Sequence, residues 1–282
     1  MKAFLGMGLL GSNFVRAMIN KGETVQVWNR TAAKAKELEP YGAKAFEDVA
    51  EAVKDAQFIH LTLKDDASVD DVLEKASKGF SKDAIIIDHT TTSKEGAIKR
   101  THEWKKRGFS YQHAPVFMGP PNALESTGFM LVSGDQAVIT LLEPHLSKMT
   151  GKLINFGEET GKAAAMKLIG NCFLVTFTAG ITDALALGKA LGIPVSDVST
   201  LFASWNPGTT LAARLRRMTD GDFSKPSWEL NMARKDTGLF LEAAGEAGIS
   251  LTSIPSIAGL MDEWIKKGYG DSDWTVIAKG AI

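Results

Sequence analysis

The chain has 282 residues and a formal net charge of −1, with a single cysteine and no bias toward basic residues. This length accommodates two domains, and the near-neutral charge offers no basic field for nucleic acid or an anionic membrane. Cys172 alone excludes an intrachain disulfide and fits a reducing, cytoplasmic setting. A strand expected from residue 3 leaves no room for a signal peptide.

The first half of the chain alternates short apolar runs with helical patterns, which predicts an α/β fold with a doubly wound parallel sheet. The spacing of apolar residues in the second half of the chain is typical of helices. The expected strands are Ala3–Leu5, Thr24–Trp28, Gly42–Ala45, Phe58–Leu63, Ala84–Asp88, Tyr111–Val116 and Gly128–Ser133. The expected helices follow Gly11 and then cover Ala32–Leu38, Phe46–Val53, Val69–Ala76 and Lys94–Arg107.

From Gly161 onward the pattern is almost wholly helical, with breaks at Gly192–Pro194, Asn206–Gly208, Gly221, Gly248 and Ile254–Pro255. We therefore predict a dinucleotide-binding domain over residues 1–157 and an all-α domain over residues 158–282. The longest apolar stretch, Leu168–Leu187, contains Asp183. A carboxylate in mid-bilayer is costly, so we expect a buried core helix and no membrane span.

A glycine-rich motif at the N-terminus predicts a dinucleotide site. Lys2-Ala-Phe-Leu-Gly6-Met7-Gly8-Leu9-Leu10-Gly11 places G-x-G-x-x-G between a strand and a helix. Gly6 would permit the tight turn, Gly8 the approach of a pyrophosphate, and Gly11 close packing of helix and strand. The phosphates would bind at the helix N-terminus. The alternative is an ordinary glycine-rich turn.

The end of the second strand indicates which dinucleotide binds. An acidic residue is expected there in an NAD site, but the sequence has Asn29, Arg30 and Thr31. Arg30 offers a fork for a 2′-phosphate, so we predict NADP as the cofactor. A solvated loop arginine is the alternative.

The five histidines are scattered along the chain, and none has a recognisable zinc spacing to another ligand, so no metal site is expected.

Several segments, in order, resemble one family. They are the glycine motif, Thr24–Thr31, Leu61–Val69, Asp88-His-Thr-Thr-Thr-Ser93, Ala114-Pro-Val-Phe-Met-Gly119, Gly161-Lys-Ala-Ala-Ala-Met-Lys-Leu-Ile-Gly-Asn171 and Lys235-Asp236. Together they resemble the β-hydroxyacid dehydrogenases, the group of 3-hydroxyisobutyrate dehydrogenase and the glyoxylate/succinic semialdehyde reductases.

The resemblance implies an oxidoreductase that transfers hydride between a nicotinamide and a small carbonyl or hydroxy compound. It implies Lys167 as catalytic acid/base with Asn171 as its companion, and a dimer or tetramer built through the helical domain. It places Thr62, Leu63, Thr91 and Lys235 at the cofactor. The substrate positions are Phe117, Met118 and Gly119, together with Lys167 and Asn171.

The residues themselves support the catalytic pair in part. Lys167 and Asn171 are four apart on one helix face, and the apolar surroundings should lower the pKa of Lys167. By pattern alone, a lysine in this position is more often a snorkelling surface residue, and only the family resemblance favours the catalytic role of Lys167. A pair such as Lys235-Asp236 is usually two solvated charges, and Thr91 alone would be a strand-end residue that caps the following helix. The cofactor roles of these residues rest wholly on the resemblance.

One departure from the family pattern bears on the substrate. The family commonly has Ser-Gly-Gly after Ala-Pro-Val, where this chain has Phe117-Met118-Gly119. Phe117 cannot donate a side-chain hydrogen bond, which favours a larger or less polar carbonyl. Two other readings stay open: an imine reductase of the same superfamily, whose members usually lack the helix lysine, and a non-catalytic NADPH-binding module.

Overall fold

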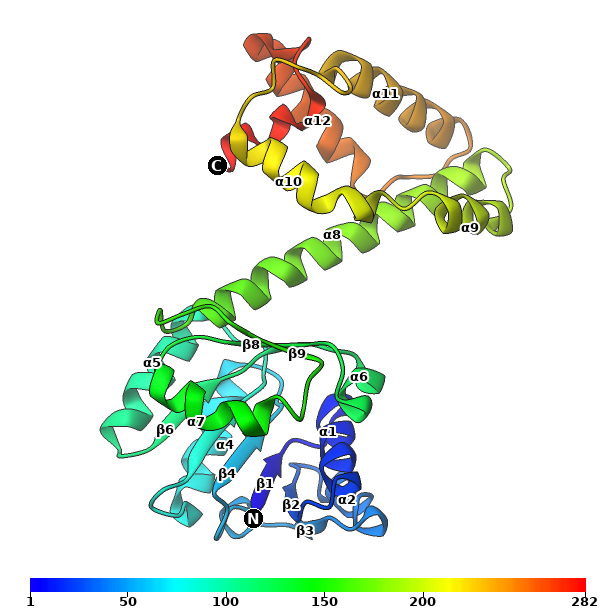
Figure 1. Ribbon diagram of the computed structural model, residues 1–282. Coiled ribbons are helices and arrows are strands. Elements are labelled where there is room, and N and C mark those ends of the chain that lie inside the picture. The colour runs from blue at the N-terminus through cyan, green and yellow to red at the C-terminus, as the bar shows by residue number, and fades with distance from the viewer. The chain divides into compact units, whose positions relative to one another are not determined.

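The computed structural model describes residues 1–282 and consists of two compact units, Met1–Asn171 and Cys172–Ile282. The first unit holds a six-stranded sheet of order β3-β2-β1-β4-β5-β6, in which all neighbouring strands are parallel (Figure 1). This is the strand order of a Rossmann sheet, so the expected fold class is confirmed. The strands are β1 (Lys2–Leu5), β2 (Val25–Trp28), β3 (Lys44–Phe46), β4 (Phe58–Leu61), β5 (Ile85–Asp88) and β6 (Ser110–His113).

Alternate strand residues enter separate cores on the two faces of this sheet. Phe4 and Ile87 belong to one buried cluster, whereas Leu5 and Ile86 belong to another. Burial on both faces explains why a central strand such as β5 is a continuous apolar run, Ile85-Ile86-Ile87. The sheet's connecting helices are α1 (Leu9–Asn20), α2 (Ala32–Lys36), α3 (Val49–Ala52), α4 (Asp66–Ala76) and α5 (Lys94–Lys106).

Two predicted elements of this unit are wrong in detail. The helix expected over Phe46–Val53 is shorter, because Phe46 pairs with Trp28 in the sheet and Asp48 caps α3 by accepting bonds from the next backbone N–H groups. The strand expected over Tyr111–Val116 ends at His113, before Pro115, which has no N–H to donate.

Beyond Pro115 the chain forms a second, three-stranded sheet of order β7-β8-β9. β7 pairs with β8 antiparallel, opposing Phe117 and Phe129, and β8 pairs with β9 in parallel. β9 and the helices α6 and α7 were not expected from the sequence. These elements are β7 (Val116–Phe117), α6 (Pro120–Glu125), β8 (Phe129–Val132), α7 (Gln136–Leu146) and β9 (Lys152–Asn155).

The second unit is helical, as expected. Its own core contains Phe223, Leu230 and Met261. Several helix boundaries coincide with the expected breaks: Gly221 ends a helix at φ 69°, and Pro255 lies in the first turn of another. The helices are α8 (Lys162–Ala190), which begins in the first unit, α9 (Val195–Ser204), α10 (Leu211–Asp220), α11 (Leu230–Glu246) and α12 (Ile254–Trp264).

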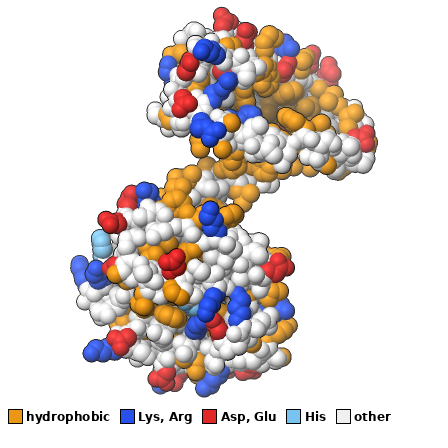
Figure 2. Space-filling view, in the orientation of Figure 1, with side chains coloured by type: hydrophobic (Ala, Val, Ile, Leu, Met, Phe, Trp, Pro, Cys, Tyr) orange, Lys and Arg blue, Asp and Glu red, His pale blue; other side chains and the backbone are white.

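Helix α8 differs from the prediction of a buried core helix. Ile169, Phe173 and Val175 are exposed in the single chain, and Figure 2 shows hydrophobic side chains gathered over this helix. By length and composition alone the helix could cross a membrane, a test that core helices of other proteins also pass. The apolar run therefore forms the expected helix, but a single chain leaves most of its side chains uncovered.

Three histidines that are far apart in sequence form a hydrogen-bonded row inside the first unit. His60 Nδ1 lies 3.0 Å from His89 Nε2, and His60 Nε2 lies 2.8 Å from His145 Nε2. The row ends at the Ala114 carbonyl, 2.8 Å from His89 Nδ1, and at the Lys2 ammonium, 3.0 Å from His145 Nδ1. The scattered appearance of these histidines in the sequence was therefore misleading.

The two ends of the row fix the proton on every ring. The Ala114 carbonyl can only accept, so His89 Nδ1 carries a hydrogen; the Lys2 ammonium can only donate, so His145 Nδ1 does not. One neutral tautomer of each ring satisfies all four bonds. Burial, reinforced by Lys2, lowers the pKa of His145 to about 3, and burial lowers that of His89 to about 4 and that of His60 well below its ordinary value.

We predict that acid weakens the first unit through this row. The unfolded chain binds protons near pH 6.5 and the folded chain does not, so the free energy of unfolding falls as pH drops below about 6.5, by about 1.5 kcal/mol per histidine between pH 6.5 and 5. Urea unfolding at both pH values measures the change. The variant His60→Gln should lose part of this pH dependence, and the exposed control His102→Gln should keep it. Equal stability at the two pH values would contradict the prediction.

Candidate active site

The glycine motif forms a tight turn pressed against the neighbouring strand. Gly6 adopts φ 100°, and a Cβ there would lie 2.1 Å from the Thr62 carbonyl oxygen. A Cβ on Gly11 would lie 2.0 Å from the Gly6 carbonyl oxygen. Thr62 also donates its hydroxyl hydrogen to that oxygen at 3.1 Å. Neither position has room for a side chain, because a neighbouring carbonyl oxygen lies too close, so both require glycine.

Gly8 faces open space and begins α1 without a side-chain cap. No protein atom lies within 4 Å of a Cβ built on it, and no side chain accepts from the first-turn N–H groups. A helix start that the protein leaves free suits a phosphate group. The residues present therefore fit the pyrophosphate of a dinucleotide.

A cleft of about 350 Å³ adjoins this turn at the carboxyl ends of β1, β2 and β4. It lies where the strand order reverses, as is usual for dinucleotides. Among the predicted cofactor residues, those that line it are Gly6, Gly8, Asn29, Arg30, Thr31, Thr62 and Leu63.

The other predicted cofactor residues do not line this cleft. Met7 is buried, and its N–H donates to Asn29 Oδ1 at 2.9 Å, which joins the turn to the end of β2. Leu9 is exposed, Leu10 packs against the core, and Thr91 is exposed between β5 and α5. Lys235 belongs to α11 of the second unit, where it pairs with Asp236 at 2.8 Å.

Two lysines that the sequence motifs did not indicate also line the cleft. Lys34 and Lys64 join Arg30 on its lining, and none of the three forms an ion pair closer than the 3.9 Å that separates Lys64 from Asp65. Lys64 follows the carboxyl end of β4, the edge of a parallel sheet where ligands bind, and that position could have signalled it.

Lys167 and Asn171 lie together on α8, within the first unit. Lys167 Nζ donates to Asn171 Oδ1 at 3.0 Å, and the lysine is only 8% exposed. Burial lowers the pKa of Lys167, as the sequence predicted. A buried ammonium that forms no ion pair suits proton donation better than surface solvation.

The three predicted substrate residues are placed differently from one another. The ring of Phe117 lies over Lys167, with 4.2 Å between the ring centroid and Nζ. Met118 packs against the core, and the N–H of Gly119 donates to Asn122 Oδ1 at 2.9 Å. Of the three, Phe117 therefore has a direct contact with the proposed acid.

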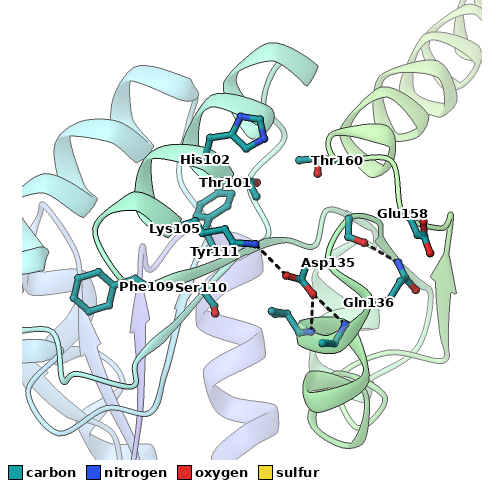
Figure 3. A pocket seen from close by; sticks show the side chains of 13 residues that line it. Thr101, His102, Lys105, Phe109, Ser110, Tyr111, Asp135, Gln136, Glu158 and Thr160 are labelled. Atoms are coloured by element: carbon teal, nitrogen blue, oxygen red, sulfur yellow. Dashed lines mark hydrogen bonds and ion pairs between the residues drawn. The ribbon is translucent and has the colours of Figure 1, made fainter.

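A larger groove, of about 510 Å³, lies elsewhere on the first unit, between α5, β6 and the start of α7 (Figure 3). Lys105 and Asp135 approach each other there at 3.6 Å, and Asp135 also caps α7. None of the predicted cofactor or catalytic residues lines this groove. The smaller cleft beside the glycine turn is the better candidate, because it contains the phosphate-binding geometry.

The chain matches known families over nearly its whole length. Residues 2–157 match the NAD binding domain of 6-phosphogluconate dehydrogenase, and residues 161–280 match the NAD-binding domain of NADP-dependent 3-hydroxyisobutyrate dehydrogenase. These matches, with the fold and the cleft, define an NAD(P)-dependent oxidoreductase that acts on CH–OH or C=O groups. The chain belongs to the β-hydroxyacid dehydrogenase family.

Individual relatives have less than 30% sequence identity to this chain but align with nearly all of it. The chain is 28% identical to 3-sulfolactaldehyde reductase of Escherichia coli (strain K12), over 98% of this chain and 93% of that protein. It is 27% identical to mitochondrial 3-hydroxyisobutyrate dehydrogenase of Drosophila melanogaster, over 97% and 87%. The solved imine reductase from Myxococcus stipitatus in complex with NADP+ has a TM-score of 0.92 at 22% identity and 99% coverage of both chains, which shows a shared fold.

Proposed function

We propose that the protein is an NADPH-dependent reductase of a small carbonyl compound, with Lys167 as the general acid. The observation that carries this proposal is the buried Lys167 ammonium, hydrogen-bonded to Asn171 and without a carboxylate partner. When bound, NADPH would supply the hydride to the carbonyl carbon.

The chemistry required of Lys167 follows from its surroundings. As hydride reaches carbon, negative charge develops on the carbonyl oxygen, and an adjacent ammonium stabilises that charge and delivers the proton. Burial lowers the pKa of Lys167 and so brings its acidity closer to physiological pH. Asn171 Oδ1 accepts one N–H and thereby orients the group.

The preference for NADPH rests on charge at the cleft. Arg30, Lys34 and Lys64 all line it, and the end of β2 carries Asn29 in place of the carboxylate that an NAD site would use. A 2′-phosphate would find three cations there and no anion on the cleft lining. An NAD ribose would lack its usual acidic partner.

An imine is the second candidate for the reduced group. Phe117 contributes an apolar ring beside Lys167, where a carboxylate-bearing substrate would need a donor. A neutral imine of apolar substituents suits that wall, and the Lys167 ammonium could protonate its nitrogen. Comparing turnover of succinic semialdehyde with that of a cyclic imine, both with NADPH, distinguishes the two.

We predict that Arg30→Ala weakens use of NADPH selectively. Loss of charge-assisted bonds of about 1.5–3 kcal/mol should lower kcat/KM for NADPH by about 10- to 100-fold and leave that for NADH almost unchanged. Steady-state kinetics with both cofactors measure this. Arg16→Ala, which changes an arginine stacked on Tyr41 outside the cleft, is the matched control. A wild type that uses the two cofactors equally would refute the preference.

We predict that Lys167→Ala lowers kcat by at least about 100-fold, because general acids contribute on the order of 10²–10⁴ to rate. NADPH affinity, measured by fluorescence titration, should not change. Lys162→Ala, at the first residue of the same helix, should keep near wild-type turnover. Unchanged turnover of the best substrate by Lys167→Ala would show that another group supplies the proton.

We also propose that the protein is a homodimer formed through the apolar faces of the second unit. Helices α9 and α10 bury no residue in the single chain. A groove of about 440 Å³ in this unit is lined mainly by Phe177, Ile181, Leu185 and Phe202. An apolar face that the single chain leaves uncovered supports an interface with a second copy.

We predict that Phe177→Asp shifts the protein from dimer to monomer, because a carboxylate would have to be buried unpaired in the interface. Light scattering after size-exclusion chromatography measures the mass at micromolar concentration. Leu141→Asp, a change at an exposed leucine of α7 in the first unit, is the control and should remain dimeric. A monomeric wild type would contradict the proposal.

A further inference from the structure

The ammonium of Lys167 has few free directions. An ammonium carries three N–H donors. One is directed to Asn171 Oδ1 at 3.0 Å, and the Phe117 ring covers another side, with its centroid 4.2 Å from Nζ. No carboxylate forms an ion pair with Lys167, so the Asn171 amide oxygen and the aromatic face of Phe117 are the groups that offer it negative potential.

The ring of Phe117 occupies space that exists only because residue 170 is glycine. A Cβ on Gly170 would lie 2.3 Å from Phe117 Cζ and 2.8 Å from Cε1. A glycine inside a helix costs about 1 kcal/mol relative to alanine, so its presence in α8 calls for a local reason. The close approach of the ring to the helix backbone is such a reason.

The strand that carries Phe117 is held firmly at its base. The Ala114 N–H donates to the Asp88 carbonyl at 2.7 Å, and the Ala114 carbonyl accepts from His89 at 2.8 Å. The Pro115 carbonyl accepts from the Leu131 N–H at 2.9 Å. The position of the ring is therefore set by both sheets of the first unit and not by the ring's contacts alone.

We propose that Phe117 is a positioning residue for Lys167: its ring, seated against Gly170, holds the ammonium so that one N–H remains for the substrate's oxygen or nitrogen. The proposal rests on the assignment of Lys167 as the general acid. It adds that the wall beside the reacting atom is an aromatic face, so the group that the substrate places there is uncharged and apolar.

The ring and burial act on the lysine in opposite directions. Burial lowers the pKa of Lys167, and an aromatic face favours the charged form and so limits that fall. The ring thus keeps the buried group protonated while leaving it acidic enough to release its proton. Removing the π face but retaining apolar bulk, as in Phe117→Leu, should shift the titration of Lys167 downward by about 0.5–1.5 pH units.

Competitive labelling of the cofactor-free protein tests this shift directly. Acetic anhydride reacts with the neutral amine, so the rate at which Lys167 is acetylated, followed by peptide mass spectrometry from pH 6 to 11, reports its titration. Phe117→Leu should lower the midpoint, and Phe117→Tyr should restore the wild-type value. Gly170→Ala should lower the midpoint as well, because it displaces the ring, and the double variant with Phe117→Leu should show no further shift.

Gly259→Ala is the matched control, because it changes a helical glycine whose added Cβ would meet nothing within 4 Å. It should leave the titration of Lys167 unchanged. The pH profile of kcat/KM should move with the labelling midpoint in each variant, with KM for NADPH unaltered. A Phe117→Leu midpoint equal to or above that of the wild type would overturn the proposal. Full turnover by Lys167→Ala would instead refute the role of Lys167 as acid, and labelling would still decide the role of the ring.

Discussion

The contact between the first turn and the neighbouring strand is the constraint on which the site depends. Gly6, Gly11 and Thr62 meet at distances that admit no side chain on either glycine. This contact sets the entry of α1 and leaves its first turn uncapped at the edge of the sheet. The tight turn borders the cleft beside β2 and β4. Backbone packing therefore contributes to the shape of the candidate cofactor site, in addition to the side chains that line it.

Whereas the glycine turn depends on backbone packing, the proposed catalytic part of the site depends on a buried charge, the ammonium of Lys167. Lys167 lies on a helix whose neighbouring side chains are hydrophobic. Its ammonium donates a hydrogen bond to Asn171 and contacts the ring of Phe117. Such an environment is unfavourable for a structural lysine and useful for an acid. The row of histidines reaches this region through the Ala114 carbonyl, because that residue begins the segment carrying Phe117. The hydrogen bond between His89 and the Ala114 carbonyl therefore links the buried histidine row to the segment that positions the Phe117 ring.

The sequence predicted the features that depend on local pattern. The sheet strands follow from short apolar runs, the glycine turn from the spacing of Gly6, Gly8 and Gly11, and the shared helix face of Lys167 and Asn171 from their separation of four residues. Three findings could not be predicted from the sequence, because each depends on which segments pack against one another in the fold. His60, His89 and His145 meet only in the fold. Phe117 of β7 contacts Gly170 of α8, and α8 is apolar without being covered in a single chain.

Gly170 shows how a local anomaly can mark a distant contact. On the sequence it is an unexplained glycine inside a long helix, and in the structure it is the seat of an aromatic ring. Phe117, in turn, is an apolar residue where a hydrogen-bonding serine was expected. Each departure is explained by the other, because a ring at 117 needs the missing Cβ at 170 and the glycine would otherwise leave a gap beside Lys167. The pair, more than either residue, supports the proposal that the substrate places an uncharged, apolar group beside Lys167.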